Sequence, residues 1–315
     1  MFDSLPILMY HYVRPPEKWF SNKHKALDTA QFLNQLDVLK QDFYFVDGRT
    51  IRDLDRFENK VKNPVWLTFD DGYSDHFDDV FPALLANKAL GSFFIPTKAV
   101  FERKLLDVNK VHILLSLDMS LTQLIEHIEE IFNANSGGDL LGQAFCDLRD
   151  QMSVANLLND ADTRFIKILL QQLLPHDLRK VVIDCLFNEH VRRDESSFVD
   201  ELYMTPDHVK TMFEAGMNIG SHGHEHSRYE YMNSESQKVD FELSINYLKS
   251  VNVYDSHLVF CYPYGSIDDN IKDIIRCLGC EVAVSIKPGI VDLSAEYIDW
   301  LELKRIDAKF FDSHF

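Results

Sequence analysis

The chain has 315 residues and a formal net charge of −18, with 46% apolar and 26% charged residues. This composition is that of a globular protein of one or two domains. The negative charge disfavours binding to nucleic acid or to anionic lipid surfaces, and no apolar run approaches the roughly 18 residues that a membrane-spanning helix needs.

The N-terminal sequence is MFDSLPILMYHYV. It carries no basic segment before its apolar stretch, which Tyr10 and His11 interrupt. We therefore expect neither a signal peptide nor membrane insertion. The 5 cysteines form an odd set without a secretory signal, which favours free thiols in a reducing compartment. The expected location is cytoplasmic.

Short apolar runs alternate with helical patterns over the first hundred residues. The predicted strands are LPILMY, FYFV, VWLTF and GSFFIP, at residues 5–10, 43–46, 65–69 and 91–96. A helix that begins at Thr29 is predicted between the first two strands. Its apolar face carries Phe32, Leu33, Leu36 and Leu39. Strands separated by helices favour βαβ units around a parallel sheet, in which ligands bind at the carboxyl ends of the strands.

Residues 102–202 have a different character. The segments LTQLIEHIEEIF, RFIKILLQQLL and VVIDCLFNEHV place apolar residues at helical spacing, and β-rich stretches are few. We therefore expect an all-helical insertion, which divides the remaining chain into a first part at residues 1–101 and a second part at residues 203–315. The insertion is a candidate lid, a candidate wall of the substrate site, or a contact in a homo-oligomer.

Strands and helices alternate again from residue 203. Thr205 and Pro206 predict a helix start, because threonine caps helices and proline suits the first helical position. The predicted strands are MNIGSH, HLVFCYPYG, EVAVSI and LELKRID, at residues 217–222, 257–265, 281–286 and 301–307. Helical patterns at residues 236–251 and 269–279 separate them.

Two adjacent aspartates, Asp70 and Asp71, follow the strand VWLTF. Neighbouring carboxylates repel each other, so the pair is costly unless a cation or a reacting group lies between them. Gly72 then permits a tight turn where the strand ends. The alternative is a pair of capping aspartates on a loop.

A histidine cluster, GSHGHEHSR, occupies residues 220–228. On a helix His222 and His226 would share a face, whereas in an extended chain His224 would join them. Either geometry can bind a divalent metal, and a chance surface run is the alternative. Two imidazoles with one aspartate would form a three-ligand site with an open position, as in hydrolytic metal centres. The other aspartate would then be free to take a proton from water.

Three motifs in this order resemble those of a known family. TFDDG (68–72), SHGHEH (221–226) and FCYPYG (260–265) are similar to the motifs of polysaccharide deacetylases, the NodB-homology enzymes of carbohydrate esterase family 4. The resemblance covers roughly residues 1–100 and 203–315. It implies an α/β fold with a distorted (β/α) barrel, one divalent metal ion, usually zinc, and hydrolysis of an N-acetyl, occasionally an O-acetyl, group of a sugar.

The resemblance also implies roles for individual residues. Asp70 matches the general base, and the metal ligands would be Asp71, His222 and His226. Tyr264 matches a third-motif residue whose backbone amide or neighbourhood helps to hold the oxyanion. His224 lies between the ligand positions and is not an expected ligand.

The chain departs from the family pattern in three respects, one of which is the helical insertion at residues 102–202, which lies outside the standard domain. Cys261 stands where the family has an arginine that orients the base, and Arg305, in LKRID, is the candidate substitute. The usual C-terminal histidine motif, which supplies the general acid, is absent, and His314 fits it poorly. However, residues 8–13, LMYHYV, resemble the N-terminal strand of circularly permuted members, which makes His11 the expected acid.

These residues together predict a metal-dependent sugar deacetylase. With no export signal, the expected substrate is an intracellular precursor for surface glycan synthesis, such as a nucleotide-linked or lipid-linked acetylated sugar. Two alternatives remain open. One is an amidase that acts on a non-sugar amide; the other is a non-catalytic sugar-binding or scaffold protein, which the missing third-motif arginine favours slightly.

Overall fold

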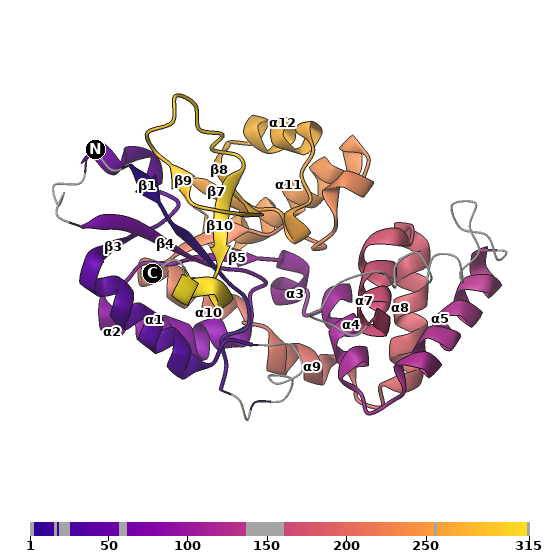
Figure 1. Cartoon of the computed structure of the whole chain (residues 1–315). Coiled ribbons are helices and arrows are strands. Elements are labelled where there is room, and N and C mark those ends of the chain that lie inside the picture. Colours follow the sequence, from indigo (N-terminus) through magenta and orange to yellow (C-terminus); the bar gives the residue numbers. More distant parts are fainter. Residues whose placement is uncertain are drawn as a thin grey trace. The chain divides into compact units, whose positions relative to one another are not determined.

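The computed structural model describes residues 3–15, 18, 26–56, 62–136, 161–254 and 257–313 (Figure 1). The chain divides into two compact units. One is formed by Met1–Lys104 with Phe198–Phe315, and the other by Leu105–Ser197. Within the described ranges, no helix is both long and apolar enough to cross a bilayer.

A closed barrel of parallel strands forms the centre of the first unit (Figure 1). Its strand order is β2-β10-β8-β7-β6-β5-β4, and pairing of β4 with β2 closes the ring. These strands are β2 (Ile7–Tyr10), β4 (Asn63–Phe69), β5 (Ser92–Ile95), β6 (Asn218–Ser221), β7 (Leu258–Cys261), β8 (Cys280–Pro288) and β10 (Leu303–Asp307). The predicted α/β fold with a distorted (β/α) barrel is confirmed.

Three further strands lie outside this ring. Strand β3 (Phe43–Val46) pairs in parallel with the first half of β4. The short strands β1 (Ser4–Leu5) and β9 (Val291–Asp292) form a separate antiparallel pair.

Helices flank the barrel on several sides. They are α1 (Thr29–Asp42), α2 (Phe81–Asn87), α3 (Thr97–Phe101), α10 (Pro206–Glu214), α11 (Ser234–Ser250) and α12 (Asp269–Cys277). In Figure 1, α1, α2 and α10 lie on one side of the strands, and α11 and α12 lie on the opposite side. Helix α9 (Glu195–Leu202) spans the boundary between the two units.

Helix α1 begins where its capping residues dictate. Asp28 accepts a hydrogen bond from the backbone of Ala30, and the side chain of Gln31 bonds back to the Asp28 backbone, so that two otherwise orphaned N–H groups are satisfied. The buried face of the helix includes Phe32, Leu36 and Leu39. Leu33, predicted on that face, is 42% exposed; each residue turns about 100° around the helix, which carries it past the edge of the apolar stripe.

Alternation along the strands divides the core of the first unit into separate clusters. Val65, Leu67 and Phe69 of β4 pack in a cluster that includes residues of α1 and α2. Trp66, which points to the other face, packs with residues of β2, β5, β7 and β8. Because successive side chains of a strand point to opposite faces, this second cluster fills the barrel interior.

The second unit contains α4 (Asp107–Ser116), α5 (Leu121–Ser136), α7 (Ala161–Ile168) and α8 (His176–His190), and a π-helical turn at Leu169–Leu173. It has a hydrophobic cluster of its own. Leu124, Ile128 and Phe132 of α5 pack there with Leu169 and with Val182 of α8. No strand occurs in the described part of residues 105–197.

Candidate active site

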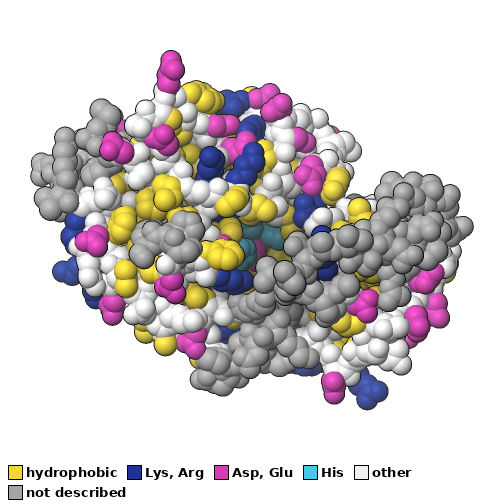
Figure 2. All heavy atoms as spheres, in the orientation of Figure 1, with side chains coloured by type: hydrophobic (Ala, Val, Ile, Leu, Met, Phe, Trp, Pro, Cys, Tyr) yellow, Lys and Arg dark blue, Asp and Glu magenta, His cyan; other side chains and the backbone are white. Residues whose placement is uncertain are grey.

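Polar side chains gather at the carboxyl ends of the barrel strands. Asp70 follows β4, His11 follows β2 and His222 follows β6, while Cys261 ends β7 and Arg305 lies in β10. Each lies two positions beyond an interior position of its strand, so that alternation turns it toward the barrel axis. Figure 2 shows histidine side chains, with acidic ones beside them, in a hollow on one face.

Arg305 holds the carboxylate of Asp70 from both oxygens. Its Nη1 donates to Asp70 Oδ1 at 2.9 Å, and its Nη2 donates to Asp70 Oδ2 at 2.8 Å. Further bonds fix the guanidinium itself, because Nε donates to Ser285 O at 2.8 Å and Nη1 donates to Thr68 Oγ1 at 3.0 Å. Its Nη2 also contacts Cys261 Sγ at 3.2 Å. Such a two-pronged pair fixes the orientation of a carboxylate as well as its position.

This pairing keeps Asp70 ionised. Burial alone would raise the pKa of Asp70, but the charge of Arg305 and its hydrogen bonds outweigh burial, and the pKa is lowered. Burial raises the pKa of the Cys261 thiol. At neutral pH the site therefore contains a carboxylate at Asp70 and a neutral thiol at Cys261.

Asp71, His222 and His226 form a second cluster beside Asp70. Their ligand atoms all lie within 4.8 Å of one another, and all three residues are buried. Asp71 Oδ1 is 3.3 Å from His222 Nε2 and 3.2 Å from His226 Nε2. Two ligands about 2.0–2.1 Å from a tetrahedral ion would lie about 3.3 Å apart. The spacing of these atoms therefore fits a divalent metal ion.

The hydrogen bonds of His222 support the same fit. Its Nδ1 lies 2.7 Å from the carbonyl oxygen of Cys261, which can only accept, so Nδ1 carries a proton and Nε2 is the nitrogen that faces Asp71. Burial would lower the pKa of His222, but Cys261 and the hydrogen bond to Asp71 raise it well above its usual range, so that without a cation Nε2 also carries a proton. Burial would raise the pKa of Asp71, but hydrogen bonds from His222 and His226 hold that pKa well below its usual range. An imidazole nitrogen this close to a carboxylate oxygen requires a proton or a cation between the two atoms, and a bound metal ion would take that place.

A second set of residues, Asp70, His222 and Cys261, is also close enough to share a metal ion. This set fits a cation poorly. The Arg305 guanidinium already contacts two of its members, and the raised pKa of the Cys261 thiol disfavours the thiolate that metals bind. Among the described residues, the Asp71 set is therefore the better candidate metal site.

Three residues of this site have a strained backbone. Asp71, His226 and Tyr264 have φ values of 77°, 55° and 57°, a region that residues other than glycine rarely adopt. Such strain costs about 1–3 kcal/mol per residue and persists where the surroundings enforce it, often at functional sites.

His11 and Tyr264 lie at the edges of this group. His11 Nε2 is 3.8 Å from Asp70 Oδ2, and the His11 side chain is 43% exposed. The ring of Tyr264 is 4.7 Å from that of His226, and the Arg228 guanidinium lies 4.7 Å from the Tyr264 ring centroid. All seven predicted site residues therefore belong to one neighbourhood. His314, the alternative acid, lies outside the described residues.

His224 points away from the candidate metal site. Its Nδ1 is 3.0 Å from Thr97 Oγ1, and its ring stacks on Tyr247 at 5.4 Å. Neither of the two sets of candidate metal ligands includes His224. The chain between His222 and His226 is neither a helix nor a strand, so neither geometry considered for the cluster applies.

Sequence reasoning missed Asp240, which holds the histidine loop. Its carboxylate accepts hydrogen bonds from the backbone N–H of His224 at 3.0 Å, the N–H of Glu225 at 2.8 Å and the Tyr229 hydroxyl at 2.6 Å. A signal was present in the sequence. Asp240 shares the buried face of α11 with Ser244, and an acid at a buried helix position needs partners.

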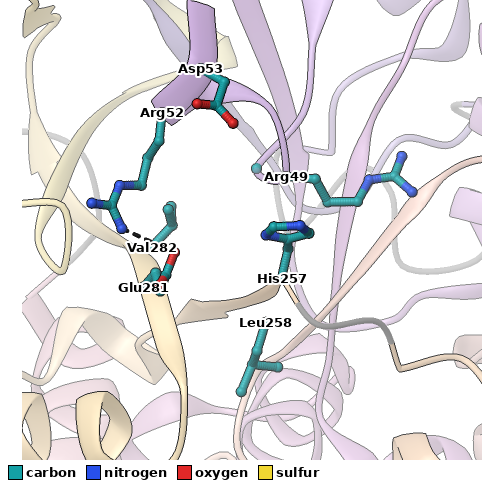
Figure 3. A pocket seen from close by; sticks show the side chains of 8 residues that line it. Arg49, Arg52, Asp53, His257, Leu258, Glu281 and Val282 are labelled. Carbon is teal, nitrogen blue, oxygen red and sulfur yellow. Dashed lines mark hydrogen bonds and ion pairs between the residues drawn. The ribbon is translucent and has the colours of Figure 1, made fainter.

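A separate cavity of about 260 Å³ lies at the other end of the barrel (Figure 3). Its lining includes Leu258 and Val282, near the amino ends of β7 and β8. The charged side chains there are paired, since Arg52 lies 3.0 Å from Glu281 and Arg49 donates to Asp47. This cavity is thus separated from the candidate metal site by the length of the strands.

The family model for polysaccharide deacetylase matches residues 181–283, which include the second and third motifs. No curated protein matches the chain. Several solved structures do. The Streptococcus pyogenes deacetylase PplD, in complex with acetate, is 20% identical with a TM-score of 0.56, over 98% of this chain and 93% of that chain.

Two other solved structures cover similar shares. IcaB from Ammonifex degensii is 17% identical with a TM-score of 0.55, over 98% of this chain and 94% of that chain. A de-N-acetylase from Aggregatibacter actinomycetemcomitans is 15% identical with a TM-score of 0.51, over 98% and 96%. Circular permutation stays a prediction. The chain resembles the polysaccharide deacetylases in sequence over residues 181–283 and in fold over nearly its whole length, which confirms the resemblance recognised from its motifs.

Proposed function

We propose that the protein is a metal-dependent hydrolase that removes an acetyl group, N-linked and occasionally O-linked, from a carbohydrate. The observation that carries this proposal is the pair of adjacent aspartates with different partners. Arg305 holds Asp70, while Asp71 faces the two imidazoles of His222 and His226. A general base beside a metal site is one arrangement that can hydrolyse an acetyl group.

The metal site would be formed by Asp71, His222 and His226, with zinc as the expected ion. An ion bound there would polarise the acetyl carbonyl and make a nearby water more acidic. Asp70, ionised and oriented by Arg305, would accept the proton of the attacking water. Because the guanidinium fixes both carboxylate oxygens, Asp70 needs no reorganisation for this step.

His11 would protonate the departing amine. An amine leaves poorly as an anion, so a proton donor opposite the base lowers the barrier. His11 lies 3.8 Å from Asp70 and is exposed enough to meet a substrate. The backbone N–H of Tyr264 is the proposed donor to the developing oxyanion, and this assignment rests on the third motif.

A groove beside His11 supports a carbohydrate substrate. A cavity of about 640 Å³ runs between α1 and the chain after β10, and its lining includes Gln31, Asn34, Lys309 and Asp312. A small pocket that includes His11 shares Lys309 with this cavity. Pockets of about 300–1,000 Å³ hold small organic ligands, and amide and charged side chains suit a ligand rich in hydroxyl groups.

The identity of the sugar stays a prediction, as do its nucleotide or lipid linkage, the cytoplasmic location and a homo-oligomer through the helical insertion. The amide and charged side chains in the lining of the groove favour a sugar over a small non-sugar amide. Retention of Asp70 with a buried arginine partner favours an enzyme over a sugar-binding scaffold, because a buried ion pair brings a scaffold no evident gain in stability.

Acetate release tests the proposal. Zinc-loaded protein would be incubated with N-acetylglucosamine oligomers, acetylated nucleotide sugars and small cyclic amides, and mass spectrometry would follow loss of the acetyl group. We expect turnover of a sugar substrate by the wild type and none by Asp70→Asn. Turnover of only the cyclic amides would support the amidase alternative, and zinc-loaded protein that turns over no substrate would support the scaffold.

A further inference from the structure

The backbone around His11 is held by two hydrogen bonds from the segment that follows β4. The N–H of Asp70 donates to Tyr10 O at 2.9 Å. The imidazole of His76 lies 2.8 Å from His11 O through its Nε2. The backbone carbonyl groups of Tyr10 and His11, which flank the N–H and Cα of His11, are therefore fixed by the segment that also carries Asp70 and Asp71.

His76 is placed for this bond by its surroundings. It begins a short π-helical segment, His76–Val80, and is fully buried. Its ring lies against those of Phe69, Tyr73 and Phe93, with centroids 5.6, 5.8 and 5.9 Å away. Three aromatic contacts leave the imidazole little freedom to turn.

The chemistry of the bond fixes the tautomer of His76. A carbonyl oxygen only accepts hydrogen bonds, so the Nε2 of His76 carries the proton and donates it to His11 O. Its Nδ1 is buried and has no hydrogen-bond partner among the described residues. Burial lowers the pKa of His76 to about 4, so the ring is neutral at neutral pH.

His11 itself has few constraints on its position. Its side chain is 43% exposed and 3.8 Å from the Asp70 carboxylate. An exposed imidazole after the end of a strand is aimed mainly by its backbone. A shift of about 1 Å in a reacting group can cost about 10²-fold in rate, so a bond that fixes this backbone has consequences for proton transfer.

We propose that His76 is a positioning residue for His11, which it acts on through its hydrogen bond to the His11 carbonyl. This inference rests on the proposed function, in which His11 protonates the leaving amine. His76 is fully buried and belongs to neither set of candidate metal ligands, so its role is to hold the acid at a fixed distance from the scissile bond.

Three substitutions separate this role from packing. His76→Phe keeps an aromatic ring among its three neighbours but removes the donor. His76→Gln restores a donor near the place of Nε2, whereas His76→Asn places its amide near Nδ1 and cannot reach His11 O. We expect Phe and Asn to lower kcat for an N-acetylated sugar by about 10- to 100-fold, and we expect Gln to regain most of that loss. Zinc content should be equal in all three.

Two comparisons make the test specific. The first is an activated acetyl ester such as p-nitrophenyl acetate, whose leaving group needs no proton, so that His76→Phe should lower its turnover far less than amide turnover. The second is a double-mutant cycle in which His76→Phe should have little further effect once His11→Ala is present. Equal losses for amide and ester, or fully additive losses in the cycle, would overturn the proposal in favour of a purely structural role.

A readout without turnover completes the experiment. In ¹⁵N-histidine NMR spectra of the wild type at neutral pH, His76 should show one neutral tautomer with the proton on Nε2, and its signal should be absent in His76→Phe. A tautomer protonated on Nδ1 would overturn the proposal. If the wild type deacetylated no sugar, the proposed function would fail, while this spectrum would still decide whether His76 donates to His11.

Discussion

Arg305 donates one hydrogen bond to each carboxylate oxygen of Asp70, although the two residues are 235 positions apart in the chain. Cys261, which the resemblance in the third motif matches to the family's arginine, contacts the same guanidinium through Sγ. The small thiol leaves room for an arginine that enters from β10 instead of β7.

Arg305→Lys tests the value of this geometry. Lysine keeps the charge but offers a point charge instead of a planar fork, so Asp70 should lose its fixed orientation. We expect kcat for an acetylated sugar to fall by about 10²-fold, with zinc content unchanged. The matched control is Lys304→Ala, an exposed position on the same strand, which should retain wild-type kcat. Undiminished turnover in Arg305→Lys would show that Asp70 does not need a guanidinium that bonds to both of its oxygens.

Arg305 should also contribute to the stability of the fold. Arg305→Met would leave Asp70 as a buried charge without its main partner. We expect a loss of about 3–5 kcal/mol in the free energy of unfolding, the usual cost of breaking a buried ion pair. Urea denaturation followed by circular dichroism measures it. A loss below about 1 kcal/mol, the range of exposed pairs, would contradict the buried pairing.

Metal content distinguishes the three histidines of the loop. His222→Ala and His226→Ala should each lose the bound ion, because each removes one of three ligands. His224→Ala should keep it, since this ring bonds to Thr97 and stacks on Tyr247. Elemental analysis of protein purified without chelator gives the answer. Loss of metal in all three variants would mean that His224 is a ligand.

Asp240→Asn should weaken metal binding from a distance. Asp240 accepts two backbone N–H groups of the histidine loop, and an asparagine amide would turn a donor toward one of them. Loss of an outer-shell partner typically costs about 10–100-fold in metal affinity. Chelator competition would measure the shift, with Glu235→Gln, exposed on the same helix, as the control. Unchanged affinity would mean that the loop keeps its shape without Asp240.

Much of the fold was predictable, because its signals are local. Alternating strands and helices indicated a parallel sheet, the resemblance to the polysaccharide deacetylases implied a barrel, and the position of Asp70 and Asp71 after a strand indicated its carboxyl end. The boundaries of the apolar face of α1 were less predictable. Phe32 and Leu33 are adjacent and both apolar, but Phe32 is buried and Leu33 is exposed. Only the packing of the neighbouring strands decides which of the two side chains is buried.

For residues far apart in the chain, the sequence indicated candidates but did not predict the contacts between them. Arg305, in the last predicted strand, was the candidate substitute for the arginine that the third motif lacks, yet its two hydrogen bonds to Asp70 depend on the closure of the barrel. His76 gave no signal, because its hydrogen bond goes to a backbone carbonyl 65 positions away. Every residue has a backbone carbonyl group, so no sequence pattern indicates which carbonyl accepts the hydrogen bond.

The central claim is that Asp70 acts on water while Asp71 holds the metal. The most direct measurement compares zinc content and acetate release in Asp70→Asn and Asp71→Asn with the wild type, using one acetylated sugar substrate. The account predicts that Asp70→Asn keeps about one zinc per chain and releases no acetate, since a neutral amide cannot take the proton, and that Asp71→Asn binds zinc weakly. Zinc lost from Asp70→Asn and retained by Asp71→Asn would contradict the account, because the two aspartates would then have exchanged roles.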